Sequence, residues 1–328
     1  MSDILFETAD NPVPDNHTAG FFDGVGGVPV RYAIFRTEVP ARGTVVLLQG
    51  RNESMEKYFE TVRDLTAAGL WVATFDWRGQ GGSGRLIRNA PRRGHVRRFA
   101  DYEQDLQIFL ERIVLPDTRM PFFLVAHSTG GLVALSMGPA LSGRIDRMVL
   151  SAPFLGLGAQ AIGEGTIARL AALACMTGLG SRALNRDKGN RPFETNLLSS
   201  DPVRFARNAA ILAAHPGLGM GPPSARWLSE SFAAIRRVTR HEHLTRITIP
   251  TLVLAPTADR LVPHISVENL CRIFRAGHMV PVDGARHELF QEADRYRSQA
   301  IAAILAFIPG SVEEGPASVV GKTSIAAG

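Results

Sequence analysis

The chain has 328 residues, of which 45% are hydrophobic and 20% are charged, and its formal net charge is +5. This composition is that of an ordinary globular protein and excludes an intrinsically disordered chain. The positive charge is not accompanied by zinc-finger spacing, an aromatic and basic RNA motif or a basic helix with heptads, so we expect no nucleic-acid partner. The two cysteines, Cys175 and Cys271, have no metal-ligand spacing, and neither a zinc site nor a disulfide framework is expected.

The N-terminus and the apolar stretches predict a chain with no secretory leader and no membrane span. Acidic residues stand near the N-terminus, where a signal peptide would carry Lys or Arg. The longest apolar stretch, residues 167–179, is interrupted by Arg169 and is shorter than the roughly 20 residues that cross a bilayer. We therefore expect a cytoplasmic protein, with peripheral contact at the inner face of the membrane left open.

The first half of the chain alternates strand and helix patterns. After a polar segment, residues 1–20, residues 20–35 alternate like a β-hairpin whose turn is at 23–27. Continuous apolar runs predict strands at 44–48, 70–75, 122–125 and 147–150. Helical spacing predicts helices at 58–68, 99–115 and 132–141. Strands that are apolar throughout and are separated by helices predict an α/β fold with a mostly parallel sheet covered on both faces.

The alternation stops near Pro153. Only helical patterns and loops follow over residues 154–245, and we predict that they form a helical cap, or lid. This cap is inserted into a single core domain made of residues 21–153 and 246–308. Within the second part of the core, strands are expected at 249–254 and 278–282 and an amphipathic helix at 288–307. The tail, residues 309–328, is rich in Gly, Ser and Ala and is expected to be disordered.

The most informative motif follows the strand at 122–125, where the sequence becomes Ala126-His-Ser-Thr-Gly130. At a sharp turn from strand to helix a serine is held with its hydroxyl exposed, and small residues two before and two after it let the chains approach closely. The motif predicts that Ser128 is a catalytic nucleophile. Because the match covers five residues, a chance serine in a glycine-rich turn is the alternative.

A serine hydroxyl needs a base within hydrogen-bond reach and a carboxylate that orients the base. Asp259 follows one late strand and His287 follows the next. The chain order Ser, Asp, His is that of α/β-hydrolases, so we predict a triad of Ser128, Asp259 and His287. The structural alternatives are that Asp259 caps a helix beginning near His264 and that His287 lies at the cap of the last helix.

The remaining acids and histidines fit these roles less well. Asp283 is four residues before His287 and is expected to form a turn with Gly284. His127 is expected to point away from Ser128 if the strand geometry persists. Four more histidines have no strand-end context and are expected at the surface or in packing; they are His241, His243, His264 and His278.

The oxyanion of an acyl-transfer reaction needs two hydrogen-bond donors, which are usually backbone N–H groups. One is expected from Thr129, directly after the nucleophile. The other is expected from Arg51, because Gly50 lets the backbone of the loop at 49–54 turn inward. This chemistry requires no metal and no organic cofactor.

With these motifs the chain resembles the serine hydrolases that join monoacylglycerol lipases with bacterial lysophospholipases in the α/β-hydrolase superfamily. The matching segments are Gln49-Gly-Arg-Asn-Glu-Ser, Asp76-Trp-Arg-Gly-Gln-Gly-Gly-Ser-Gly84, Ala126-His-Ser-Thr-Gly-Gly131, Ala258-Asp-Arg-Leu and Gly284-Ala-Arg-His-Glu. The resemblance implies the α/β-hydrolase fold and hydrolysis of single-acyl lipid esters by Ser128, Asp259 and His287 beneath a helical cap.

The chain departs from the family pattern at two positions. Gln49 replaces the commoner histidine before Gly50, and Ala126 replaces a glycine. Gln49, together with Glu53 and Tyr58, resembles the lysophospholipase branch more than the monoacylglycerol one. The head group and the acyl length are not predicted.

Two further patterns have simpler explanations. The stretch 79–84 fits G-x-G-x-x-G, but no helix follows it to hold a pyrophosphate, so we predict a turn. Six arginines lie between residues 85 and 98. They could bind lipid, through a phosphate head group or an anionic bilayer, and the alternative is that they form a solvated surface. They are Arg85, Arg88, Arg92, Arg93, Arg97 and Arg98.

The predicted partner is a small lipid ester, with its acyl chain against apolar residues of the cap. The predicted contacts are Trp227, Phe232 and Phe154. Two alternatives stay on the same fold, a small-ester hydrolase and a serine aminopeptidase. A third is a lipid-binding protein with no catalysis, and the oligomeric state is not predicted.

Overall fold

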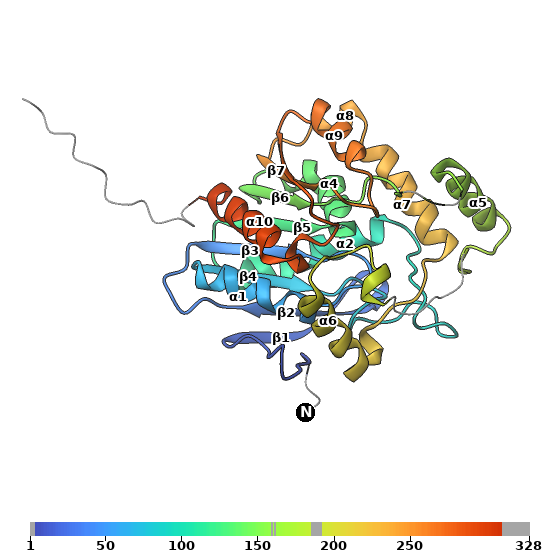
Figure 1. The fold of residues 1–328 in the computed structure, drawn as a ribbon. Coiled ribbons are helices and arrows are strands. Elements are labelled where there is room, and N and C mark those ends of the chain that lie inside the picture. Colours follow the sequence, from blue (N-terminus) through green and yellow to red (C-terminus); the bar gives the residue numbers. More distant parts are fainter. Residues whose placement is uncertain (1–3, 159, 161, 185–191, 310–328) are drawn as a thin grey trace, which may run out of the picture.

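The computed structural model describes residues 4–158, 160, 162–184 and 192–309 and is built around one eight-stranded sheet (Figure 1). The strand order is β1-β2-β4-β3-β5-β6-β7-β8. The strands are β1 (His17–Asp23), β2 (Pro29–Phe35), β3 (Gly43–Leu48), β4 (Leu70–Phe75), β5 (Phe122–His127), β6 (Arg147–Ser151), β7 (Thr251–Pro256) and β8 (Gly277–Val282). The pairings of β1 with β2 and of β2 with β4 are antiparallel, and the others are parallel. The carboxyl ends of β3 to β8 therefore meet at one edge.

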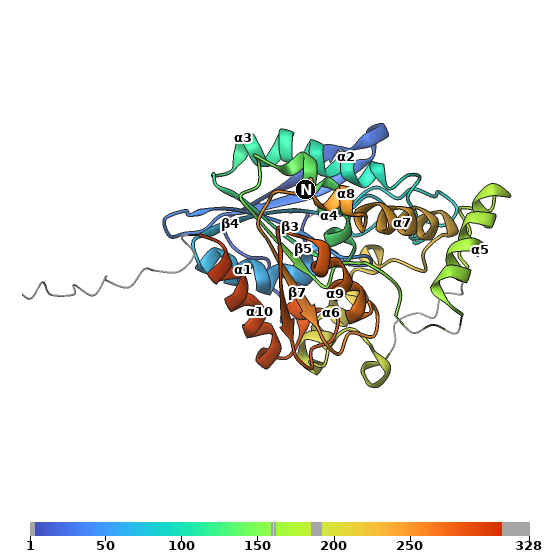
Figure 2. The same ribbon diagram turned by 90° about the horizontal axis from the view of Figure 1, so that it is seen from above.

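Helices cover both faces of this sheet, as Figure 2 shows from above. On one face α1 (Phe59–Ala67) and α10 (Asp294–Phe307) pack against the odd-numbered side chains of β3. On the other face α2 (Ala100–Phe109) and α4 (Thr129–Leu141) pack against its even-numbered side chains. All six residues of β3 are buried, because alternate side chains of a strand covered on both sides enter two different cores.

The predicted elements of the core are present, and several of them have different ends. β1 begins at His17, before the predicted hairpin start at residue 20, because Thr18 pairs with Ile34. The helix predicted at 99–115 is α2 followed by a π-helical turn (Leu110–Val114) and α3 (Leu115–Asp117). The last predicted helix starts with a short 3-10 turn, η6 (Leu289–Gln291), and α10 follows it. Two other 3-10 turns are η1 (Val25–Gly27) and η2 (Met55–Tyr58).

Between β6 and β7 the described residues form helices and no strand, in agreement with the helical spacing of the sequence. They are α5 (Glu164–Met176), η4 (Phe193–Thr195), α6 (Pro202–Ala214), η5 (Pro216–Leu218), α7 (Ala225–Val238) and α8 (His241–Leu244). α7 packs against α4, and α5 packs against α7 at the edge of the molecule farthest from α10 (Figure 1). α9 (His264–Ile273) joins β7 to β8.

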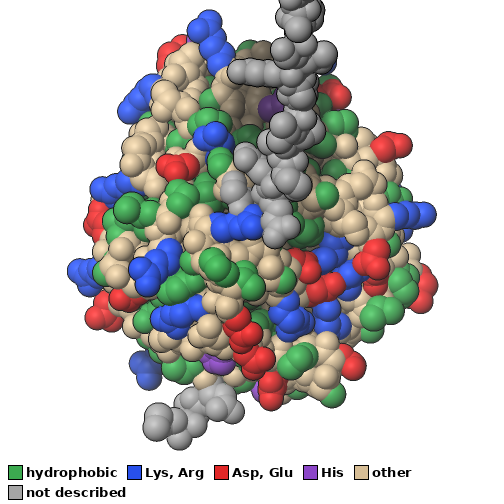
Figure 3. Space-filling view, turned by 90° about the vertical axis from the view of Figure 1, so that its left-hand side faces the viewer, with side chains coloured by type: hydrophobic (Ala, Val, Ile, Leu, Met, Phe, Trp, Pro, Cys, Tyr) green, Lys and Arg blue, Asp and Glu red, His purple; other side chains and the backbone are tan. Residues whose placement is uncertain are grey.

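No helix in the part of the chain that the structure describes is long and apolar enough to cross a bilayer. Figure 3 shows the side of the molecule away from α5, where Lys and Arg side chains are interspersed with Asp and Glu. The predicted disordered tail lies outside the described residues, except for Pro309.

Candidate active site

Ser128 occupies a tight turn between β5, which ends at His127, and α4, which begins at Thr129. Its backbone has φ 50° and ψ −114°, a left-handed conformation that a non-glycine residue rarely adopts. Three hydrogen bonds hold this conformation: Ser128 N donates to the carbonyl of Ser151, and the carbonyl of Ser128 accepts from Leu132 N and Phe154 N. The turn therefore has the strained backbone of a nucleophile elbow.

The small residue after the serine is required by the close approach of β3. A Cβ atom on Gly130 would lie 2.6 Å from the carbonyl oxygen of Gln49 and 2.8 Å from that of Leu48. Gly130 N also donates to the Gln49 carbonyl at 3.1 Å. The elbow is thus joined directly to the loop that follows β3.

The three predicted triad residues come together at the carboxyl edge of the sheet. Ser128 Oγ lies 3.0 Å from His287 Nε2, and His287 Nδ1 lies 2.7 Å from Asp259 Oδ2. The other carboxylate oxygen, Oδ1, accepts from the backbone N–H groups of Leu261 and Val262 at 2.7 and 3.0 Å. These contacts form a line from hydroxyl to imidazole to carboxylate, which is the arrangement that activates a serine.

The environment of Asp259 favours its ionised form. Burial alone would raise the pKa of this carboxyl, but the hydrogen bond and charge interaction with His287 and the two backbone donors lower it below its usual value. Asp259 does not cap α9, whose N-cap is Pro263. The carboxylate is therefore available to orient His287 and to stabilise its imidazolium form.

The competing acid takes the structural role that the sequence predicted. Asp283 Oδ1 accepts a hydrogen bond from Thr257 Oγ1 at 2.9 Å, and Gly284 follows with φ 75°. Gly284 N donates to the same hydroxyl. Asp283 and Gly284 thus form a turn beside β7.

His127 lies closer to the chemistry than the sequence argument places it. Its side chain does not bond the Ser128 hydroxyl, yet its ring lies 4.8 Å from the ring of His287. Its Nδ1 is 3.2 Å from the carbonyl oxygen of Ser151. Burial lowers the pKa of His127 to about 4, so the ring is neutral near pH 7 and acts as packing beneath His287.

Two of the other histidines have packing contacts, as expected. His243 Nε2 lies 2.9 Å from the carbonyl oxygen of Leu135, and His264 Nδ1 lies 3.2 Å from that of Pro256. Neither contact involves a triad residue.

The loop after β3 lies against the elbow, and the N–H groups next to the two predicted oxyanion donors already have acceptors. Gly50 N donates to Glu53 Oε2 at 2.5 Å, and Gly130 N is used by Gln49, so neither group is the donor. Thr129 N–H is the first of α4, and the first N–H groups of a helix have no acceptor within it. The partial positive charge at this helix end favours an oxyanion there.

The predicted substrate contacts Trp227 and Phe154 are next to Arg51, in the loop that follows β3. Their rings are stacked with centroids 5.8 Å apart, and the guanidinium of Arg51 lies 5.4 Å from the Trp227 ring centre. Trp227 Nε1 donates to Tyr102 Oη at 3.2 Å. Phe232, of which 3% is exposed, belongs to the same apolar cluster on α7.

The segment that links α6 to α7 is also bonded to the loop that follows β3. Met220 N donates to Asn52 Oδ1 at 2.8 Å, and the Arg51 guanidinium donates to the carbonyl of Gly221. Asn52 has φ 61°, a conformation that asparagine tolerates. The position of this segment therefore affects the loop that borders Ser128.

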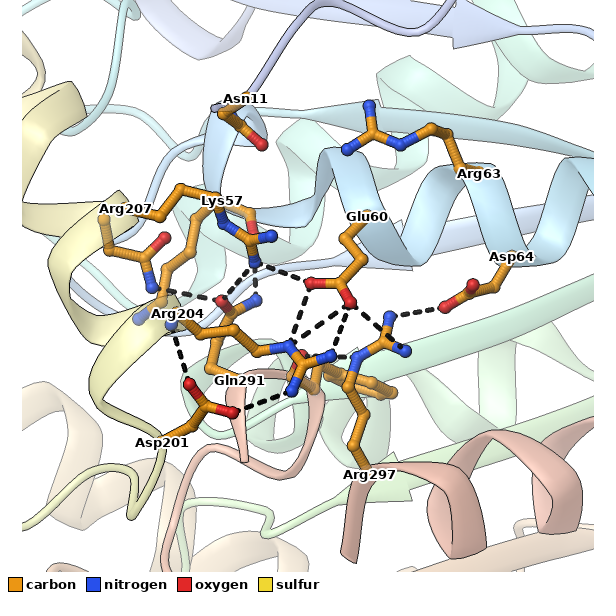
Figure 4. Close-up of polar contacts among 12 residues, drawn as sticks. Asn11, Lys57, Glu60, Arg63, Asp64, Asp201, Arg204, Arg207, Gln291 and Arg297 are labelled. Atoms are coloured by element: carbon orange, nitrogen blue, oxygen red, sulfur yellow. Dashed lines mark hydrogen bonds and ion pairs between the residues drawn. The ribbon is translucent and has the colours of Figure 1, made fainter. Parts of the chain in front are cut away.

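A network of ion pairs fixes α6 to the core (Figure 4). Glu60 of α1 accepts from Arg204 and Arg207 of α6 and pairs with Arg297 of α10. Arg204 also pairs with Asp201 at 3.0 Å. Burial alone would raise the pKa of Glu60, but the guanidinium groups lower it to about 2. Sequence reasoning missed this network, because the partners are far apart along the chain.

The glycines at 79–84 form a turn, as predicted, and no helix follows them before α2. Gly79 N donates to the carbonyl of Gly84, and Gly82 N donates to Asp76 Oδ2. A Cβ on Gly81 would lie 2.1 Å from the same carboxylate oxygen. Arg85 donates to the carbonyls of Gly79 and Gly81, so the first arginine of the basic run stabilises this turn.

Among the residues that the structure describes, no group of three or more His, Cys, Asp and Glu side chains could hold a metal ion. Cys175 and Cys271 are free thiols.

Comparisons with known proteins agree with this architecture. Residues 39–294 match a family model described as serine aminopeptidase, S33. Lysophospholipase L2 of Escherichia coli (strain K12) is 33% identical over 302 residues, which cover 87% of this chain and 86% of that protein. A monoacylglycerol lipase of Mycolicibacterium smegmatis is 27% identical over 288 residues, which cover 84% and 91%.

Solved structures show the same fold. The crystal structure of Paleococcus ferrophilus monoacylglycerol lipase matches with a TM-score of 0.68 at 25% identity and covers 86% of this chain and 99% of that chain. A soluble variant of the Saccharomyces cerevisiae monoglyceride lipase matches in fold with a TM-score of 0.73 at 18% identity, covering 94% and 99%.

Proposed function

The chain belongs to the hydrolase family described as serine aminopeptidase, S33, and from its lysophospholipase and monoacylglycerol lipase relatives we propose that it hydrolyses esters of single-acyl lipids through an acyl-enzyme on Ser128. It has the α/β-hydrolase fold and is a carboxylic ester hydrolase, which confirms both expectations from the sequence. The names of the relatives, lysophospholipase L2 and monoacylglycerol lipase, support a lysophospholipid or a monoacylglycerol as the substrate. The observation that carries the mechanism is the continuous line of contacts from Ser128 to Asp259.

In the proposed reaction Ser128 Oγ attacks the ester carbonyl carbon while His287 Nε2 takes the hydroxyl proton. The carbonyl oxygen becomes an oxyanion that accepts hydrogen bonds from the Arg51 and Thr129 N–H groups. His287 then gives its proton to the leaving alcohol oxygen as the ester bond breaks. Water attacks the acyl-enzyme, His287 takes a proton from that water, and the proton returns to Ser128 as the fatty acid leaves. Asp259 stabilises the imidazolium throughout.

The apolar surroundings of the site favour an acyl chain over a peptide. Trp227 and Phe154 stack beside Arg51 and support a lipid chain leading away from residues 49–54, the loop that carries the proposed donor Arg51 N–H and is called the oxyanion loop below. An aminopeptidase must hold the α-ammonium group of its substrate with a carboxylate. Two buried carboxylates, those of Glu53 and Glu288, lie near His287, and both are already paired with Lys57 rather than available to a substrate ammonium.

We propose that residues 154–245 act as the cap of this acyl site.

The deciding experiment is a substrate panel assayed with the full chain and with Ser128→Ala. It contains lysophosphatidylcholine, 1-monoacylglycerol, p-nitrophenyl butyrate and an aminoacyl p-nitroanilide. We expect hydrolysis of the long-chain lipid esters, little hydrolysis of the anilide and loss of all hydrolysis in Ser128→Ala. A fluorophosphonate that fails to label Ser128 in the folded chain would favour a lipid-binding protein, and a preference for the anilide would favour an aminopeptidase.

Peripheral contact with an anionic membrane at the cytoplasmic face is part of this proposal. α5 and the residues after it carry exposed apolar side chains, among them Leu173 and Met176, of which 53% and 78% are exposed. Arg169 and Arg182 are exposed in the same region. Co-sedimentation with anionic liposomes should fall as salt rises and should weaken in Met176→Glu. Equal sedimentation of this variant would argue against contact through α5.

A further inference from the structure

A buried chain of three charged groups lies beside the triad, and the catalytic steps above do not use it. Lys57 Nζ donates to Glu53 Oε1 at 2.8 Å and to Glu288 Oε1 at 2.6 Å. Only 13% of the Lys57 side chain is exposed, and the two carboxylate side chains are 3% and 9% exposed. The ammonium therefore lies between two carboxylates with little access to water.

At one end of these three charged groups, Glu53 fixes the loop that follows β3. Glu53 Oε2 accepts from Gly50 N at 2.5 Å and from Tyr58 Oη at 2.6 Å. Gly50 directly precedes Arg51, whose N–H is the proposed oxyanion donor. A Cβ on Gly50 would lie 2.8 Å from the same Glu53 oxygen, so the backbone contacts this carboxylate closely.

The other end fixes the loop that carries the general base. Glu288 directly follows His287, and its own N–H donates to the carbonyl of Leu198 at 2.9 Å. A second contact runs parallel to the ion chain, because Gln291 Nε2 donates to the carbonyl oxygen of Lys57 at 2.8 Å. Figure 4 shows Lys57 and Gln291 side by side. The oxyanion loop and the His287 loop are thus connected through Lys57.

The charges of Glu53, Lys57 and Glu288 depend on one another. Burial alone would raise the pKa of Glu53, but the Lys57 ammonium lowers it to about 2. Burial alone would lower the pKa of Lys57, and its two carboxylates raise it above the usual value. Burial raises the pKa of Glu288. Without the ammonium, two buried carboxylates would face each other, and one of them would have to take a proton or move away.

We propose that Lys57 is a positioning residue of the hydrolase reaction, because its ammonium holds the Glu53 loop and the Glu288 loop at the separation that lets Arg51 N–H and His287 act on one carbonyl group. The inference rests on the proposed function, since it assumes that these two groups meet the same substrate. Geometry of this kind has a large effect on rate, and a displacement of about 1 Å can lower a rate by about 100-fold.

The test compares Lys57→Met with Lys57→Arg and with Arg78→Met. Arg78 forms an ion pair with Asp105 that is also buried, and its side chain bonds neither loop, so Arg78→Met is the control for breaking a buried pair. For Lys57→Met we expect a kcat about 10- to 100-fold below that of the wild type, a KM within about threefold of it, and an equally slowed fluorophosphonate labelling of Ser128. In Lys57→Arg, whose guanidinium can donate to both carboxylates, we expect most of kcat to return.

A wild-type kcat in folded Lys57→Met, a change in KM alone, or an equal loss of kcat in Arg78→Met would overturn the proposal. If Lys57→Met does not fold, Glu288→Ala replaces it, because Lys57 then keeps its pair with Glu53 and its carbonyl contact with Gln291, and only the ion pair with the His287 loop is lost. The same outcomes apply to that variant. Wild-type hydrolysis that disappears in Ser128→Ala shows that the proposed function stands even where the Lys57 variants refute the positioning role.

Discussion

Replacing Gly130 by alanine tests how closely the elbow must approach β3. The new Cβ would lie 2.6 Å from the Gln49 carbonyl oxygen and 2.8 Å from the Leu48 carbonyl oxygen, whereas ordinary contact begins at 3.4 Å. Both neighbours are backbone atoms and cannot rotate away. The elbow and the end of β3 must therefore separate by about 0.8 Å, and the hydrogen bond from Gly130 N to Gln49, 3.1 Å long, is stretched.

Two costs follow from this separation. Overpacking costs about 1–3 kcal/mol of unfolding free energy and the weakened hydrogen bond about 1 kcal/mol, so we expect Gly130→Ala to be less stable by about 2–4 kcal/mol. Ser128 moves relative to the Arg51 N–H by a similar distance, and we expect kcat to fall by up to about 100-fold.

Urea unfolding and steady-state kinetics on p-nitrophenyl butyrate measure both effects. Gly165→Ala is the matched control, because a Cβ there meets nothing within 4 Å and the residue lies inside α5. It should be as stable as the wild type or slightly more stable, with unchanged kcat on this short ester. A Gly130→Ala variant with wild-type stability and kcat would refute the close-approach argument.

Three further predictions concern the triad, the neutral histidine beneath it and the α6 network. Asp259→Asn should lose roughly 10³- to 10⁴-fold in kcat at nearly unchanged melting temperature, because an amide oxygen can still accept from Leu261 and Val262 N–H; a loss below tenfold would contradict its role. The pKa of His127 is about 4 in the folded chain against 6.5 for the free side chain, so about 3 kcal/mol of stability is present above pH 6.5 and is lost as the pH falls towards 4. Urea unfolding at pH 7.5 and 4.5 should show a smaller difference for His127→Gln than for the wild type, and equal differences would count against this assignment. Glu60→Gln should lower stability by about 1–2 kcal/mol and speed proteolysis within α6, since Arg204 and Arg207 lose their shared carboxylate; an unchanged cleavage rate would show that α6 is held by other contacts.

The sequence by itself determined the α/β class, the elbow and the order of the triad residues. A strand that is buried on both faces is apolar throughout, and it spans only a few consecutive residues, so a short stretch of sequence is enough to recognise it. The glycine two residues after Ser128 is equally local, since the turn needs it within the same few residues. Asp259 and His287 could be predicted because parallel strands end at one edge of the sheet, so side chains that follow two such strands meet there.

Only the tertiary structure decided which side chains support that site. Lys57 and Glu288 are 231 positions apart, and Glu60 and Arg204 are 144 apart, and no spacing or periodicity connects residues at such separations. The position of His127 beside His287 likewise depends on how the last loop folds back over β5. The predicted triad residues follow the ends of strands, and the sequence pattern shows where strands end. The side chains that position them come from loops that pack together only when the whole chain has folded.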